Sequence, residues 1–264
     1  KCLHLSHDGR CAESNFIRVQ ALKAYFSCMR FFYAPLVSPT HVLDENESKH
    51  VVRVLRANAG DVVALTDGAG RLYQGKIEIL DKRQCVLETT LIQTSPPASP
   101  NLTLVIAPTK STDRFEWLLE KAMEFGVRTI QPIWTDRSER KQEKHDRWQR
   151  ILVSALKQSQ QVWLTDLRPA CTWDEWLKQA PLGGFIAHCE PTVKPLLFHA
   201  ISPGHDAWIA IGPEGDFTPK EIESALRHGA QAVSLGNQRL RSETAGLSVI
   251  QTFQLAQLTV VSES

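Results

Sequence analysis

In the second half of the chain, short apolar runs alternate with longer stretches in which apolar positions recur every three or four residues. Residues 102–107, 129–134, 185–187 and 208–211 are apolar runs of strand length, and residues 113–125 have helical spacing. Four or five such strands with helices between them predict an α/β fold built on a parallel sheet.

Residues 29–94 have a different pattern, in which several short strands accompany one short helix. The strands are expected at 30–34, 62–65, 72–77 and 86–92, and the helix at 47–56. The sequence Asp67-Gly68-Ala69-Gly70 between two of the strands is a hairpin signal. This combination predicts a small β-barrel, a scaffold often used to present loops to RNA.

Three basic side chains of the predicted helix are spaced to share one face. His50, Arg53 and Arg56 follow one another at intervals of three residues. A cationic face of this kind is suited to phosphate contacts. The alternative is an ordinary solvated helix face.

A short segment at residues 95–100 separates the two patterns. It contains three prolines, which cannot continue a strand or a helix and form a stiff spacer. Residues 101–264 are therefore expected to form a second domain. Residues 1–28 differ from both domains, because they hold three of the six cysteines and precede Met29. They lack the apolar core and cleavage site of a signal peptide, and we expect an upstream or non-native extension without function.

The composition narrows the class of protein without naming a partner. The chain is 42% hydrophobic and 22% charged with a net charge of +1, so any basic surface for nucleic acid must be local. No run of eighteen apolar residues is long enough to span a membrane. The six cysteines form no CxxC pair, which argues against a zinc site and a disulfide framework and favours a reducing cytoplasm.

Two loops near the C-terminus have the composition of a ligand site. Gly212-Pro213-Glu214-Gly215 follows the strand at 208–211, and a capping box of Thr218, Pro219 and Glu221 then begins a helix that Gly229 ends. A strand at 232–235 opens into a polar loop at 236–244, before a final helix at about 245–258.

The two strands are expected to be adjacent and parallel, which places both loops at the same carboxyl edge of the sheet, where ligands of open α/β sheets bind. The alternative is a tight turn and a solvated loop. Neither loop has the phosphate-binding pattern GxxxxGK(S/T) or the dinucleotide pattern GxGxxG.

The assembled motifs resemble the SPOUT methyltransferases, and more narrowly the RsmE family, which methylates N(3) of a uridine base in small-subunit (16S) ribosomal RNA. The resemblance is carried by the GPEG turn, by residues 235–245, and by the segments 50–56, 120–127 and 137–140. It covers Met29 to about Leu258.

The resemblance implies an enzyme with a knotted parallel sheet that has helices on both faces, preceded by a PUA-like RNA-binding β-barrel. It implies S-adenosylmethionine as the cofactor, bound inside a C-terminal trefoil knot, and a cytoplasmic homodimer that requires no metal and no membrane. The open alternatives are a SPOUT ribose 2′-O-methyltransferase and a noncatalytic RNA-binding assembly factor, with a dinucleotide oxidoreductase as a more distant possibility.

The same resemblance implies roles for individual residues. Arg241 is expected to stabilise charge on the target base, with Arg239 as the second candidate. Glu243 is expected to act either as a general base or as a structural group at the last helix. The residues expected to bind the cofactor are His188, Cys189, Glu190, Gly212, Pro213, Glu214, Gly215, Leu235, Gly236, Asn237, Leu240 and Thr244. The residues expected to bind RNA are His50, Arg53, Arg56, Lys110, Arg114, Arg137 and Arg140.

Overall fold

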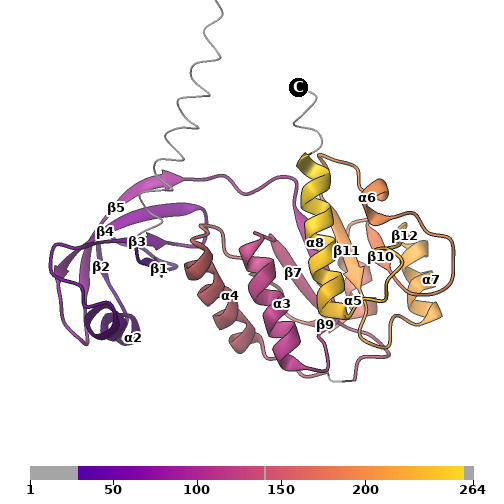
Figure 1. Cartoon of the computed structure of the whole chain (residues 1–264), viewed down its shortest axis with the longest axis horizontal. Coiled ribbons are helices and arrows are strands. Elements are labelled where there is room, and N and C mark those ends of the chain that lie inside the picture. The colour runs from indigo at the N-terminus through magenta and orange to yellow at the C-terminus, as the bar shows by residue number, and fades with distance from the viewer. Residues whose placement is uncertain (1–28, 140, 259–264) are drawn as a thin grey trace, which may run out of the picture. The chain divides into compact units, whose positions relative to one another are not determined.

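A computed structural model describes residues 29–139 and 141–258. The chain divides into two compact units between Ser95 and Pro96, within the proline-containing segment. Each unit has its own sheet and its own core (Figure 1). The expected extension at residues 1–28 lies outside the described residues.

The N-terminal unit is a five-stranded mixed sheet with the strand order β1-β3-β4-β5-β2. β1 pairs with β3 in parallel and every other neighbouring pair is antiparallel. The sequence prediction found four of these strands and missed β2, whose sequence Thr40-His41-Val42 contains a single apolar position. The strands are β1 Phe31–Tyr33, β2 Thr40–Val42, β3 Val62–Thr66, β4 Arg71–Ile79 and β5 Val86–Thr94.

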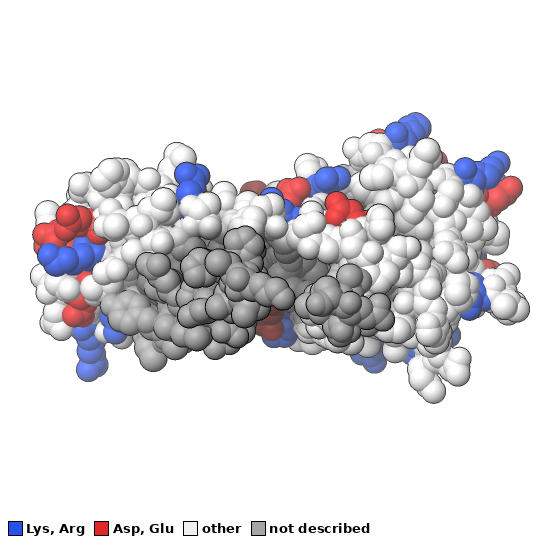
Figure 2. All heavy atoms as spheres, turned by 90° about the horizontal axis from the view of Figure 1, so that it is seen from above, with Lys and Arg blue, Asp and Glu red and all other residues white. Residues whose placement is uncertain are grey.

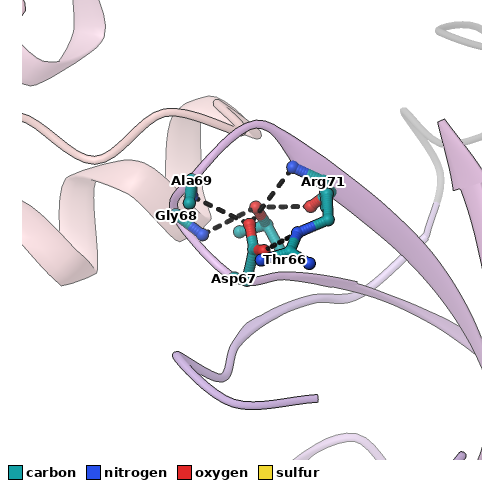
Figure 3. Close-up of polar contacts among 5 residues, drawn as sticks. All are labelled: Thr66, Asp67, Gly68, Ala69 and Arg71. Atoms are coloured by element: carbon teal, nitrogen blue, oxygen red, sulfur yellow. Dashed lines mark hydrogen bonds and ion pairs between the residues drawn. The ribbon is translucent and has the colours of Figure 1, made fainter. Parts of the chain in front are cut away.

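The predicted hairpin joins β3 to β4, and its turn is held by Asp67 (Figure 3). The Asp67 carboxylate accepts hydrogen bonds from the backbone N–H groups of Ala69 (2.8 Å) and Arg71 (3.1 Å) and from the Arg71 guanidinium. Thr66 Oγ1 donates to the Arg71 carbonyl oxygen at 3.0 Å. These short-range bonds fix the turn and therefore the register of the two strands.

The helix expected at 47–56 is different in the structure. It begins as the α-helix α2 (Glu45–Lys49), continues as the π-helical turn η1 (His50–Val54), and ends before Arg56, whose φ is 46°. Because hydrogen bonds in a π-helix run from i to i+5, a spacing of three no longer places side chains above one another. The prediction that His50, Arg53 and Arg56 share one helix face is wrong, although all three side chains are exposed.

The C-terminal unit is a parallel sheet with the order β12-β10-β11-β6-β7-β8, in which β9 also pairs with β7. This confirms the predicted α/β class. The strands are β6 Leu102–Ile106, β7 Thr129–Trp134, β8 Asp166–Leu167, β9 Cys171–Thr172, β10 Phe185–Ala187, β11 Ala207–Ile211 and β12 Gln231–Val233. The helices are α3 Thr112–Glu124, α4 His145–Ser159, α5 Trp173–Gln179, α6 Leu197–Ala200, α7 Pro219–Arg227 and α8 Ser242–Leu258.

Helices cover both faces of this sheet (Figure 1). On one face α8 packs against α3, β6 and β11, and α3 packs in turn against α4. On the other face Trp173 and Trp176 of α5 join Ile222 and Ala225 of α7 over the strand residue Ile133 and its neighbours. Burial of these large side chains against the sheet is the main contribution that holds the layers together.

The strand order corrects one expectation about the site. β11 and β12 are not adjacent, because β10 lies between them and pairs in parallel with both. The loops after β11 and β12 nevertheless meet at one carboxyl edge, together with the loop after β10. The polar loop after β12 is also shorter than expected, since α8 begins at Ser242 rather than at about residue 245.

Candidate functional site

A cavity of about 830 Å³ lies at the carboxyl edge of β10, β11 and β12. The last residue of each strand reaches its wall, and the loops that follow complete it. The lining residues are Arg114, Ala187, His188, Cys189, Lys194, Ile211, Gly212, Pro213, Glu214, Gly215, Asp216, Val233, Ser234, Leu235, Gly236, Asn237, Gln238, Arg239, Leu240, Arg241, Ser242 and Ala245. This volume lies within the range of small-molecule and cofactor pockets.

The loop after β11 is so compact that position 212 has no room for a side chain, and Gly212 occupies it. A Cβ atom at this position would lie 3.1 Å from both the backbone nitrogen and the ring of Phe217. Glu214 is tied to the loop after β6, since its Oε1 accepts a hydrogen bond from the Lys110 backbone N–H at 2.9 Å. The backbone of residues 212–215 is therefore held close to the cavity by packing and by a neighbouring loop.

The loop after β12 joins the β11 loop through the first turn of α8. Ser242 Oγ donates to the Gly212 carbonyl oxygen at 3.0 Å and is buried. Gly236 has a φ of 122°, which favours glycine and lets the chain turn back toward α8. Arg239 and Arg241 follow as exposed side chains on the cavity wall.

The loop after β10 is fastened by Lys194. Its ammonium group donates to the carbonyl oxygens of His188 (2.8 Å) and Glu190 (2.6 Å) and lies 3.3 Å from His188 Nδ1. Burial, and then the Lys194 charge, hold the pKa of His188 below its usual range, which favours the neutral imidazole. Burial, and then the Asp216 carboxylate, raise the pKa of the Cys189 thiol, which disfavours a thiolate nucleophile.

Glu243 lies outside the cavity wall. Its carboxylate is buried in the first turn of α8, with Oε1 3.6 Å from Nε of Arg114, which does line the cavity. The position suits a carboxylate, since the positive end of the helix dipole lies there. Of the two roles expected for Glu243, the structural one fits this placement better than proton removal from a bound base.

The side chains expected to bind RNA are spread over both units. Lys110 forms an ion pair with Glu139 at 2.6 Å, and Arg137 Nη1 donates to the carbonyl oxygens of Gly215 (2.9 Å) and Phe217 (3.2 Å). Arg140 lies outside the described residues. On the face seen in Figure 2, outside the grey atoms, basic and acidic side chains are interspersed, in keeping with the nearly balanced net charge.

Most side chains expected around the cofactor do meet at the cavity, and only Glu190 and Thr244 of that set lie outside its wall. Lys194 and Asp216 are charged lining residues that the sequence analysis did not assign. Lys194 had no signal, because it lies in an irregular segment without a motif, whereas Asp216 directly continues the GPEG turn. The other unassigned lining residues are Ala187, Ile211, Val233, Ser234, Gln238, Ser242 and Ala245.

Two features are absent from residues 29–139 and 141–258. None of their helices combines the length and apolar character needed to cross a membrane. No group of three or more His, Cys, Asp or Glu side chains among them is arranged to hold a metal ion.

Comparison with known proteins identifies both units. Residues 96–254 match the family described as "RNA methyltransferase domain", and residues 43–90 match the family described as "RNA methyltransferase PUA domain". Over 258 residues the chain is 29% identical to ribosomal RNA small subunit methyltransferase E of Synechocystis sp., covering 94% of this chain and 82% of that protein.

Solved structures agree with this assignment. A probable rRNA methyltransferase from Porphyromonas gingivalis is 36% identical with a TM-score of 0.80, covering 88% of this chain and all of that chain. Ribosomal RNA small subunit methyltransferase E from Neisseria gonorrhoeae, solved with S-adenosyl methionine bound, is 31% identical with a TM-score of 0.76, covering 86% of this chain and 97% of that chain. The chain therefore belongs to the RNA methyltransferase family, in the group of ribosomal RNA small subunit methyltransferase E.

Proposed function

We propose that the protein transfers a methyl group from S-adenosylmethionine to N(3) of a uridine base in small-subunit ribosomal RNA. The observation that carries the proposal is the 830 Å³ cavity, which three loops enclose at one carboxyl edge of the sheet. The Neisseria gonorrhoeae relative that binds S-adenosyl methionine supports the choice of cofactor.

The residues around the cavity fit this cofactor. The packed backbone at Gly212 and the turn at Gly236 leave main-chain groups at the wall, where an adenosine and an amino acid moiety need hydrogen-bond partners. We assign the holding role to the loops at 212–215 and 235–240, with His188 and Cys189 completing the pocket. When bound, the cofactor supplies an electrophilic methyl group.

The chain's own contribution to the chemistry is electrostatic. Loss of the N(3) proton leaves negative charge on the two flanking carbonyl oxygens of uracil, and a fixed cation near them lowers the barrier. Arg241 lines the cavity and accepts the Ala245 N–H at 2.8 Å through its carbonyl oxygen, so it caps the start of α8. The positive end of the helix dipole therefore adds to the field of its guanidinium.

Glu243 supports this arrangement, although its carboxylate does not line the cavity. We propose that its buried carboxylate positions Arg114, which contributes a second cation to the cavity. The negative charge also offsets the repulsion between Arg114 and Arg241. Proton removal from the base is then left to water or to the RNA itself.

Ribosomal RNA is proposed to contact the N-terminal unit as well. His50, Arg53 and Arg56 are exposed, and among the described residues no ion pair engages them. They are suited to phosphate contacts, which position RNA without reading its sequence. Lys110 and Arg137 already have partners within the protein, so their proposed RNA contacts would require sharing those groups. A cytoplasmic location follows from this substrate.

We further propose a homodimer and a trefoil knot around the cavity, on the strength of the family resemblance. The second half of α8 exposes Leu255 and Leu258, which a partner subunit would cover. Sedimentation equilibrium checks the dimer, and a monomer at micromolar concentration would contradict it. A crystal structure traced through residues 185–258 checks the knot, and an unthreaded chain would rule it out.

The test of the function is methyl transfer from labelled S-adenosylmethionine to small ribosomal subunits that lack the modification. We expect 3-methyluridine in the digested RNA, and a ribose-methylated nucleoside would overturn the proposal.

Arg241→Ala is expected to lower the rate at least about a hundred-fold while donor affinity stays within about two-fold, because the guanidinium acts on the developing charge. An equal loss of donor affinity by calorimetry would reassign Arg241 to the pocket.

A further inference from the structure

Asp216 combines an unusual backbone conformation with a place on the cavity wall. Its φ is 63°, and besides Arg56 and Gln160 it is the only non-glycine residue with positive φ among the described residues. Glycine adopts this conformation without steric cost, whereas a side chain there needs a compensating interaction. The turn itself does not need the side chain, since the Asp216 backbone N–H closes it on the Pro213 carbonyl oxygen at 2.9 Å.

The compensating interaction is made by the carboxylate. Oδ2 accepts a hydrogen bond from the Cys189 backbone N–H at 2.7 Å, and Oδ1 accepts from the backbone N–H of Phe217 at 2.8 Å. Cys189 lies two residues beyond Ala187, which forms the last ladder pair of β10 with Ile211 of β11. The Asp216 carboxylate therefore continues the connection between the two strands past the end of their ladder.

Lys194 also holds this loop, but as a hydrogen-bond donor where Asp216 is an acceptor. It binds the carbonyl oxygens of His188 and Glu190, whereas Asp216 binds the N–H of the residue between them. A donor and an acceptor thus hold three successive residues, two of which line the cavity.

We propose that Asp216 is a positioning residue, which holds the His188–Cys189 wall at a fixed distance from the 212–215 wall and so presets the cavity for the methyl donor. This inference rests on the proposed function, because it takes S-adenosylmethionine as the occupant. A preset wall avoids the entropic cost of ordering the loop when the donor binds.

Two substitutions in the full-length chain separate the backbone from the carboxylate. Asp216→Gly removes the carboxylate but suits the positive φ, so relief of the backbone is expected to offset part of the stability lost with the two hydrogen bonds. Donor affinity, measured by calorimetry with S-adenosylmethionine, is expected to fall roughly ten-fold, since a charge-assisted hydrogen bond is lost. Asp216→Asn keeps one acceptor oxygen and tolerates the conformation, so it is expected to restore part of that loss.

Gln160→Gly is the matched control, because Gln160 also has positive φ but ends α4 and does not line the cavity. It is expected to leave donor affinity unchanged. Hydrogen–deuterium exchange over residues 187–191 without donor gives a readout that does not depend on the proposed function. The Cys189 amide is expected to exchange faster in Asp216→Gly than in the wild type.

The outcomes distinguish the two proposals. Absence of donor binding by the wild-type chain defeats the proposed function, and the exchange rate at Cys189 still decides whether Asp216 fastens the wall. Wild-type donor affinity in Asp216→Gly, or unchanged exchange at Cys189, overturns the positioning role. A comparable loss in Gln160→Gly also overturns it, since backbone relief alone would then explain the effect.

Discussion

The guanidinium of Arg137 already makes hydrogen bonds within the protein. It binds the carbonyl oxygens of Gly215 and Phe217, and a Cβ at Gly215 would lie 3.2 Å from the Arg137 Cβ. The side chain expected to bind RNA therefore supports a loop that lines the cavity.

We predict that Arg137→Ala weakens S-adenosylmethionine binding about three- to ten-fold, because two carbonyl groups lose their donor and the loop loosens. Arg137→Lys is expected to recover only part of the affinity. The ammonium group can still donate hydrogen bonds, but it lacks the planar fork of the guanidinium. Calorimetry measures both, with Lys141→Ala as an exposed charge control. Weakened RNA binding at unchanged donor affinity would instead assign Arg137 to the RNA.

A second prediction at this scale concerns His188, whose pKa lies below its usual 6.5 because of burial and then the Lys194 charge. Replacing Lys194 by Met is expected to raise the His188 pKa toward 6.5, as followed by NMR titration of the imidazole. Because the folded-state pKa is the lower one, this histidine's contribution to stability is fully present above 6.5 and is lost as the pH falls through the folded pKa. An unchanged or lower pKa in Lys194→Met would contradict the electrostatic role of Lys194.

At the scale of elements, helix α7, which follows the cavity loop at 212–216, was the most predictable. Its N-cap Thr218, Pro219 at the first position and Glu221 at the third are local signals, and the structure confirms the capping box. Strand order was not predictable, because the position of β10 between β11 and β12 is set by the packing of the whole sheet. The two-residue strands β8 and β9 are too short to have a period, although Thr172 and Glu175 form a second capping box that signals α5.

Glu221 also joins two elements, which gives a prediction for stability. Its Oε2 accepts from the Thr218 N–H at 2.7 Å, and its Oε1 accepts from the Asp136 N–H at 2.8 Å. Thr218→Ala is expected to cost about 1 kcal/mol, the usual value of an N-cap. Glu221→Ala is expected to cost more, about 1.5–3 kcal/mol, because it removes the hydrogen bonds of two backbone N–H groups to a charged carboxylate. Urea unfolding measures both, and an equal cost would mean that the bond to Asp136 contributes nothing.

At the scale of the whole molecule, the net charge of +1 leaves no general attraction to a polyanion. Affinity for RNA must come from local groups in either unit, and we propose different roles for two sets of them. The cavity cations Arg114 and Arg241 are proposed to act near the target base, whereas the exposed His50, Arg53 and Arg56 lie in the other unit.

This separation predicts different salt responses for two classes of variant. The affinity of the full-length chain for single-stranded ribosomal RNA is expected to fall linearly with salt on logarithmic axes, and each lost phosphate contact reduces the slope by about 0.7. Arg53→Ala combined with Arg56→Ala should therefore flatten the slope by about 1.4, since two contacts are removed. Lys141→Ala serves as the control and should leave the slope unchanged. A double variant with the wild-type slope would show that phosphate contacts are made elsewhere, because removal of a contacting cation must reduce the number of counterions released.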